Sequence, residues 1–322
     1  MAAGKATSKT KALDVLPMVL MGGLFIVVDL LAFWISGPFE AAGEVAFVNP
    51  SDPFNLVFFF TVMIVFTAVI LLIAKYGKTR IIQAIFLGST GLLGLYVFYP
   101  LLGYVFPWAV TIESVGSVMY VPLILSIVIM AFIVALLVKF PEWYVIDISG
   151  VITAVGAIAM LGISLTILIV LVLLIGMALY DAISVYKTKH MIDLADTMID
   201  LKLPILYVIP KTRDYSLIKQ TKGLKESLAE GEKRDAFFMG VGDIVIPGIL
   251  AAAAFHNIAD NGLIIGLSVV AGTLVGFAAL MTFVIKGKPQ AGLPFLCPGA
   301  ILGYVISSLI LTGGLAGISF AL

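Results

Sequence analysis

Long apolar stretches, separated in most places by short polar segments, dominate the chain. A helix that crosses a bilayer needs about 20 mostly apolar residues, each adding about 1.5 Å of length. Residues 144–186 contain no strong break, but Gly162, Ser164 and the length of the run favour two spans joined by a very tight turn. The pattern predicts an all-α, polytopic membrane protein with nine transmembrane helices, near residues 15–36, 54–74, 81–105, 117–139, 144–162, 163–186, 237–256, 262–285 and 296–321.

Basic residues gather in every second connection between these stretches. The N-terminal segment carries Lys5, Lys9 and Lys11, and further basic residues lie in 75–80 and 286–288, whereas the intervening loops are acidic. Because cytoplasmic loops collect Lys and Arg, this bias predicts a cytoplasmic N-terminus and an external C-terminus. The compact chain, with its lack of long tails, favours the cell membrane of a prokaryote.

One connection, residues 187–235, is much longer than the others and is expected on the cytoplasmic side. It divides the chain into an N-terminal six-helix part (1–186), the loop itself and a C-terminal three-helix part (237–322). The loop begins with HMIDLADTMIDL, in which Asp193, Asp196 and Asp200 share one helical face, a pattern typical of a helix on a membrane surface. The later stretch LPILYVI fits either a short strand or an unpaired link between helices.

The composition excludes several classes of function. The chain is 61% hydrophobic and 12% charged, with a formal net charge of zero, and its basic residues form no long run that would suit a nucleic acid. Cys297 is the single cysteine, so no internal disulfide forms, and with only His190 and His256 a zinc site lacks its usual ligands. We expect no cofactor and no metal.

Four acidic residues lie inside the predicted spans: Asp29, Asp147, Asp181 and Asp243. An ionised acid in hydrocarbon costs at least about 2.5 to 3.5 kcal/mol, so such residues bond a neighbouring helix or serve a function. If the flanking segments are helical, Asp181 lies about 9 Å and Asp243 about 12 Å inside the cytoplasmic boundary. This similar depth on consecutive helices predicts a pair, whereas Asp29 and Asp147 have no evident acidic partner and are expected to be structural.

Two carboxylates held close together cannot both ionise cheaply, so they share one proton. Such a pair hydrolyses peptides: one member takes a proton from water while the other supports the carbonyl oxygen. Gly240 and Gly242 flank Asp243 and allow a substrate backbone to approach closely, although many of the 31 glycines simply pack helices.

Three short motifs extend this hypothesis. Tyr180-Asp181 resembles the YD motif, and Gly240-Val241-Gly242-Asp243 the GxGD motif, of the presenilin and signal peptide peptidase family of intramembrane aspartyl proteases, in which the archaeal presenilin homologues are most similar to this chain. Pro294-Phe295-Leu296 corresponds to the family's Pro-Ala-Leu motif, with phenylalanine in place of alanine. The order of the motifs, the nine spans and the long loop after the sixth span match the family along the whole chain.

The resemblance implies that Asp181 and Asp243 are catalytic, that water is the nucleophile, and that the segment around Pro294 helps to hold the substrate, a transmembrane helix of another membrane protein. Phe295 is expected to fill space beside the pair that alanine leaves open. Two local alternatives stay open. Tyr180 either orients Asp181 or is an interfacial aromatic residue, and Pro294 either contacts the substrate or only starts the last helix.

A proton-coupled transporter or channel is the main alternative, because paired intramembrane acids also form proton relays. It predicts half-symmetric repeats and acids near the midplane, and the sequence shows neither. A zinc protease is excluded by the lack of HExxH, and His256 has no Gly-x-Ser-Gly nucleophile nearby, so it is expected to be a polar residue at the external end of its helix. The sequence therefore favours an intramembrane aspartyl endopeptidase in the lipid bilayer and leaves its oligomeric state open.

Overall fold

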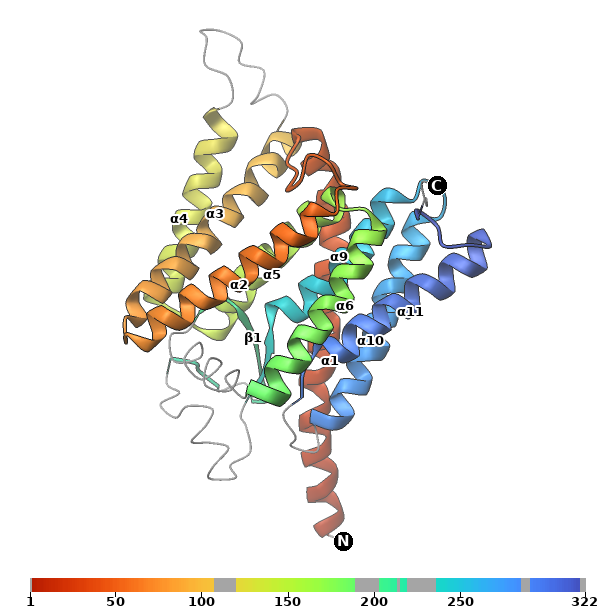
Figure 1. Cartoon of the computed structure of the whole chain (residues 1–322). Coiled ribbons are helices and arrows are strands. Elements are labelled where there is room, and N and C mark those ends of the chain that lie inside the picture. Colours follow the sequence, from red (N-terminus) through yellow and green to blue (C-terminus); the bar gives the residue numbers. More distant parts are fainter. Residues whose placement is uncertain are drawn as a thin grey trace.

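The computed structural model describes residues 2–106, 120–188, 203–212, 215–218, 236–284 and 290–318. These residues form nine α-helices and a two-stranded sheet, and Figure 1 places α9 between α3 and α4 on one side and α10 and α11 on the other. The predicted surface helix around Asp193 lies outside the described residues. In chain order the elements are α1 (Ala2–Ala42), α2 (Phe54–Lys75), α3 (Thr79–Val105), α4 (Tyr120–Lys139), α5 (Trp143–Ser164), α6 (Ile167–Ile183), the π-helix η2 (Ser184–Thr188), β1 (Leu206–Pro210), β2 (Ala236–Gly240), α9 (Val241–Asn257), α10 (Gly262–Val284) and α11 (Leu293–Thr312).

Eight of these helices are long and apolar enough to cross a membrane, and α9 is a shorter apolar helix of 17 residues. The prediction of a nine-helix membrane protein is therefore confirmed. The run 144–186 does contain two spans, but the chain breaks at Leu165 and Thr166, both in extended conformation, and not at Gly162. Gly162 instead packs inside the bundle, where an added Cβ would lie 2.5 Å from the Cβ of Ala252.

The helix α9 occupies the core of the bundle. It contacts α1, α5, α6, α10 and α11, and residues 246–254 are all buried. Small side chains such as those of Ala251–Ala254 allow the neighbouring helices to approach its backbone closely. By contrast, only Asn55 and Ile70 of α2 are buried, so most side chains of α2 face the surrounding lipid at least in part.

The helices α10 and α11 pack backbone against backbone. Glycines spaced four residues apart, Gly272 and Gly276 in α10 and Gly299 and Gly303 in α11, form the contact. A Cβ on Gly276 would overlap the carbonyl oxygen of Phe295, and one on Gly299 would overlap that of Gly272. This packing fixes the beginning of α11, the segment that contains Pro294.

The two strands lie at the same end of the bundle as the last turn of α6 (Figure 1). They are antiparallel, in a register that pairs Leu206 with Gly240 and Pro210 with Ala236, and the N–H of Val241 donates to the carbonyl of Ile205 at 2.9 Å. The stretch LPILYVI thus adopts the strand alternative.

The start of the seventh span was predicted wrongly. Residues 237–240 were expected to be helical, but they are strand, and the helix begins only at Val241. The aromatic sequence AFFMG suits a strand, and pairing with β1 satisfies backbone groups that a first helical turn leaves open. The 12 Å depth assigned to Asp243 assumed helix throughout, so it does not hold.

Candidate active site

Asp181 lies two residues before the end of α6, where the helix continues into the π-helix η2. Its side chain is buried, with 7% of its surface exposed. The backbone N–H of Leu293 donates to its Oδ2 at 3.0 Å, and the backbone of Gly292 provides a second hydrogen bond. Asp181 is therefore held by a segment more than a hundred residues away in the sequence.

Asp243 lies in the first turn of α9, directly after β2. Gly240 is the N-cap residue, with φ −63° and ψ 137°, and its backbone bonds the Asp243 carboxylate. An acid at the third helical position that reaches back to the N-cap N–H is one half of a capping box. The conformation of Asp243 is thus determined by its own local sequence.

Both carboxylates meet at Gly292 and Leu293. A Cβ on Gly292 would lie 2.9 Å from Oδ1 of Asp243, so the carboxylate rests against the bare backbone of this glycine, while the next residue bonds Asp181. The two acids are close enough to act on each other electrostatically. The structure therefore brings Asp181 and Asp243 together, as the sequence predicts, around one short backbone segment.

Sequence reasoning missed Gly292 and Leu293. The first is the N-cap residue of α11, and its carbonyl accepts hydrogen bonds from the N–H groups of Phe295 and Leu296 at 3.1 and 3.2 Å. The only available signal was a glycine two residues before Pro294, which does not stand out among 31 glycines.

The predicted motif around Pro294 begins α11. Pro294 is its second residue, where a missing N–H is tolerated, and Leu296 is fully buried. The ring of Phe295 packs against Phe283 of α10, with centroids 5.4 Å apart. The buried thiol of Cys297 is close enough for both carboxylates to act on it electrostatically. The role of Phe295 beside the pair stays a prediction.

Three other candidate residues lie around the pair. Tyr180 is 38% exposed, and its orienting role also stays a prediction. A Cβ on Gly240 would lie 3.4 Å from Oδ2 of Asp243, whereas one on Gly242 would meet nothing within 4 Å. Open space therefore lies beside Gly242.

A second connection links α6 to the start of α11. The hydroxyl of Tyr186, in η2, donates to Oε1 of Gln290 at 2.6 Å. Gln290 precedes Gly292 by two residues, so this bond ties the extension of the Asp181 helix to the segment that contacts both acids.

Asp29 and Asp147 make different contacts. Oδ1 of Asp147, in α5, accepts a hydrogen bond from the N–H of Val208 in β1 at 2.8 Å. Asp29, in α1, lies against Gly248 of α9, where an added Cβ would be 2.5 Å from its Oδ1. Neither contact involves the Gly292–Leu293 segment.

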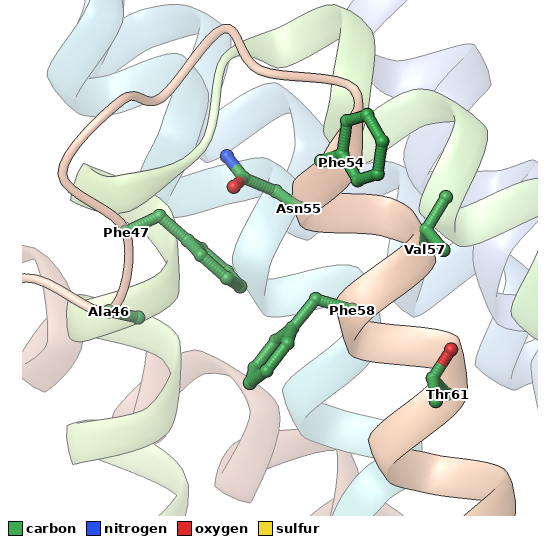
Figure 2. Close-up of a pocket in the computed structure, with 7 residues that line it drawn as sticks. All are labelled: Ala46, Phe47, Phe54, Asn55, Val57, Phe58 and Thr61. Atoms are coloured by element: carbon green, nitrogen blue, oxygen red, sulfur yellow. The ribbon is translucent and has the colours of Figure 1, made fainter.

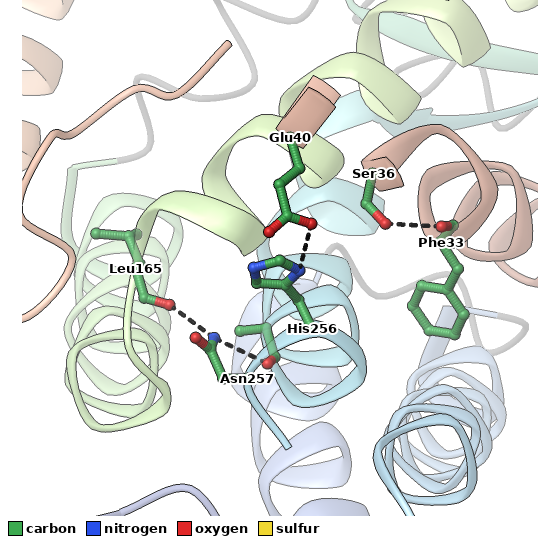
Figure 3. Close-up of polar contacts among 7 residues, drawn as sticks. Phe33, Ser36, Glu40, Leu165, His256 and Asn257 are labelled. Atoms are coloured by element: carbon green, nitrogen blue, oxygen red, sulfur yellow. Dashed lines mark hydrogen bonds and ion pairs between the residues drawn. The ribbon is translucent and has the colours of Figure 1, made fainter. Parts of the chain in front are cut away.

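Polar contacts at the opposite end of α9 are shown in Figure 3. Nδ1 of His256, in the last turn, lies 3.8 Å from Oε2 of Glu40 in α1. Asn257 donates to the carbonyls of Leu165 and Ala253 at 3.2 and 2.9 Å. These contacts join α9 to α1 and to the break before α6, and they are structural in character.

A cavity of about 490 Å³ lies between the loop after α1 and the start of α2 (Figure 2). No ionisable side chain lines it, so it offers no acid or base for hydrolysis. Its lining residues are Ala46, Phe47, Phe54, Asn55, Val57, Phe58 and Thr61.

The chain is similar to known proteins in both sequence and structure. Residues 22–313 match the family model described as "Signal-peptide peptidase, presenilin aspartyl protease". The chain belongs to this family. Two similar solved structures, both of a presenilin family intramembrane aspartate protease, are 32% identical to it. The structure in space group C222 has a TM-score of 0.65 and covers 91% of this chain and 99% of its own, and the one in space group P2 has 0.62, 92% and 98%. No curated protein sequence matched the chain.

The match to the presenilin and signal-peptide peptidase family begins within α1 and includes every later element, to the end of α11. The resemblance that the sequence motifs suggest is therefore confirmed for the family.

Proposed function

We propose that this membrane protein hydrolyses peptide bonds inside the transmembrane segments of other membrane proteins, with Asp181 and Asp243 as its catalytic pair. One observation carries the assignment: two intramembrane carboxylates from distant helices meet on the Gly292–Leu293 backbone. Isolated structural acids need no such convergence, whereas an aspartyl protease requires it.

The chemistry uses one water molecule and one shared proton. The ionised carboxylate takes a proton from water as the water oxygen bonds the carbonyl carbon, and the protonated carboxyl donates to the carbonyl oxygen. The tetrahedral intermediate then collapses, the C–N bond breaks, and the pair delivers a proton to the leaving amine. The backbone N–H of Leu293 keeps Asp181 oriented throughout.

A substrate helix must unwind before its carbonyls can be attacked, and its backbone then needs new hydrogen-bond partners. In the observed register the backbone N–H and C=O groups of Tyr207 and Met239 point toward each other. The backbone groups of Val208 and Phe238 therefore point away from the partner strand. Asp147 already bonds the outward N–H of Val208. An extended substrate can then pair with the outer edge of β2. A substrate in that position lies close to Asp243, which follows the end of β2 by three residues.

The distribution of charges supports an orientation. We propose that the N-terminus and the 187–235 loop are cytoplasmic and the C-terminus is external, in the cell membrane of a prokaryote. The loop then divides a six-helix part from a three-helix part, each contributing one aspartate. Figure 1 places the two ends of the chain at opposite ends of the bundle, which agrees with an odd number of spans. Substrates in this orientation are single spans with external N-termini, and a C-terminus that reacts with a cytoplasm-confined label would contradict the proposal.

The test of function uses purified protein and a labelled transmembrane peptide in detergent. We expect cleavage within the apolar segment, blocked by a transition-state inhibitor of aspartyl proteases, and mass spectrometry identifies the bonds. Intact peptide, together with proton flux through reconstituted vesicles, would instead support the transporter alternative.

A further inference from the structure

Two buried polar atoms have no hydrogen-bond partner within the described ranges of the chain: Oδ1 of Asp29 and the hydroxyl oxygen of Tyr207. Asp29 is 2% exposed and Tyr207 is fully buried. An unsatisfied buried group costs about 1 to 3 kcal/mol, so native proteins rarely leave such a group without a partner.

The two groups lie within electrostatic range of each other. Tyr207 is the second residue of β1, opposite Met239, and its ring packs on Gly150 of α5, where an added Cβ would be 3.1 Å from its Cε1. Asp29 and Asp147 both act on the Tyr207 hydroxyl electrostatically. We call Asp29, Asp147 and Tyr207 the Tyr207 cluster, and it joins α1, α5 and β1.

The donors and acceptors in the Tyr207 cluster are complementary. Burial, and then the nearby Asp147 and Asp29, raise the pKa of Tyr207 above its ordinary value, so the hydroxyl keeps its proton and is a donor. One oxygen of Asp147 accepts from Val208, while Oδ1 of Asp29 is an acceptor without a donor. A water molecule between them can accept from Tyr207 and donate to Asp29, which satisfies both.

We propose that Asp29 and Tyr207 bind one buried water molecule, and that through it they position the β1–β2 pair beside the catalytic site. The second half of this proposal rests on the proposed protease function. Because β2 runs directly into the turn that holds Asp243, an anchored β1 fixes the edge of β2 that faces the substrate. Asp29 and Tyr207 are positioning residues, since their contacts do not include the Gly292–Leu293 segment.

The first test is a double-mutant cycle on thermal stability with Asp29→Leu, Tyr207→Phe and the combined variant. Each single change leaves the water with one partner, so each lowers Tm. The double variant removes both polar groups, and we expect its Tm to be no lower than that of the worse single variant. Additive losses of Tm would overturn the shared water, and so would a high-resolution structure without water density between the two side chains.

The second test is kinetic and uses the same peptide. We expect Tyr207→Phe to raise KM about two- to tenfold, the equivalent of one neutral hydrogen bond, and to shift the positions of cleavage while kcat changes little. Asp29→Asn keeps an acceptor and rescues the wild-type pattern, unlike Asp29→Leu. The matched control is Tyr304→Phe, which removes another buried tyrosine hydroxyl, bonded to the carbonyl of Ala316 at 2.6 Å, and lowers stability alone.

These outcomes separate the two proposals. If the losses of Tm in Asp29→Leu and Tyr207→Phe are not additive but the wild type cleaves no peptide, the water site is supported and the protease function is rejected. An unchanged KM and cleavage pattern in Tyr207→Phe would reject the positioning role while the protease function stands. If Asp29→Leu fails to fold, the comparison of Tyr207→Phe with Tyr304→Phe still tests the positioning role, because only Tyr207→Phe should change the cleavage pattern.

Discussion

Asp181 and Asp243 reach the same place from opposite ends of their helices, and the structure holds them in different ways. Asp243 lies in the first turn of α9, and its carboxylate accepts a hydrogen bond from the backbone of Gly240, within its own GxGD sequence. Asp181 lies near the end of α6 and is bonded by Leu293, a residue of a distant segment. One half of the site is therefore preformed by local sequence, and the other half is assembled only when α11 docks against α10.

The difference shows where regulation of the site can act. A change that moves the start of α11 leaves the bond between Gly240 and Asp243 in place but removes the hydrogen bond from Leu293 to Asp181. We therefore expect the close packing of α10 and α11 through their glycines to support activity as well as stability.

Loss of either carboxylate has the largest expected effect. Asp181→Asn and Asp243→Asn preserve shape and volume but remove an ionisable site, so each should stay folded and lose about 10³-fold or more in cleavage rate. The double variant should be hardly worse, because residues that act as one unit are not additive. Peptide cleavage and Tm are measured together, and Asp29→Asn and Asp147→Asn, which should keep substantial activity, are the controls. A folded single variant with the wild-type rate would reject the protease assignment.

A side chain at position 292 should disturb Asp181 and Asp243 at once. In Gly292→Ala the new Cβ would lie about 3 Å from all three carboxylate atoms of Asp243, beside the residue that bonds Asp181. We expect a loss of about a hundredfold in kcat, typical of misplacing reacting groups by about 1 Å. Gly88→Ala in α3, where an added Cβ meets nothing within 4 Å, is the matched control. Equal rates for the two variants would argue against the contact at Gly292.

The pair should give a bell-shaped dependence of kcat/KM on pH. On the acid side the general base becomes protonated, and on the alkaline side the shared proton is lost, so the rate falls about tenfold per pH unit on each limb. Initial rates across the pH range check this, with Tm recorded at each pH to exclude unfolding. A rate that rises steadily with pH would show that no protonated carboxyl takes part.

Loss of the hydrogen bond between Tyr186 and Gln290 should have the smallest effect on the cleavage rate. Tyr186→Phe removes one exposed hydrogen bond on the assembled half of the site, so we expect kcat to fall about two- to threefold with little change in Tm. Tyr144→Phe, which alters an exposed tyrosine of α5, is the control. A larger loss in the control would show that the Tyr186 bond does not support the site.

The sequence predicts the parts of this structure that depend on local or periodic features. Nine spans follow from hydropathy, because a bilayer demands a long apolar helix wherever the backbone crosses it. The pairing of Asp181 with Asp243 was predicted because these two of the four intramembrane acids lie near the same side of the membrane on consecutive helices. The break at Leu165 was placed a few residues early, because glycine and serine serve equally well as packing residues within a helix.

Long-range pairing decided the features that the sequence did not reveal. The stretch AFFMG is apolar and continuous with the helix that follows, so hydropathy alone cannot separate a strand from a first helical turn. It is a strand because β1 pairs with it. Likewise, Gly292 and Leu293 matter through contacts made across more than a hundred residues, and Phe295 turns out to pack on Phe283.

Affinity for a transition-state analogue of peptide hydrolysis tests whether the two aspartates serve one site. The hydroxyl of such an inhibitor occupies the position of the attacking water, so it should bond both carboxylates. Binding to wild type, Asp181→Asn and Asp243→Asn is measured by calorimetry in detergent, with Asp260→Asn, in an exposed loop, as control. We predict that either active-site variant weakens binding by a similar factor, about ten- to hundredfold, while the control binds like wild type. Weakened binding in only one variant, or in neither, would contradict a shared catalytic pair.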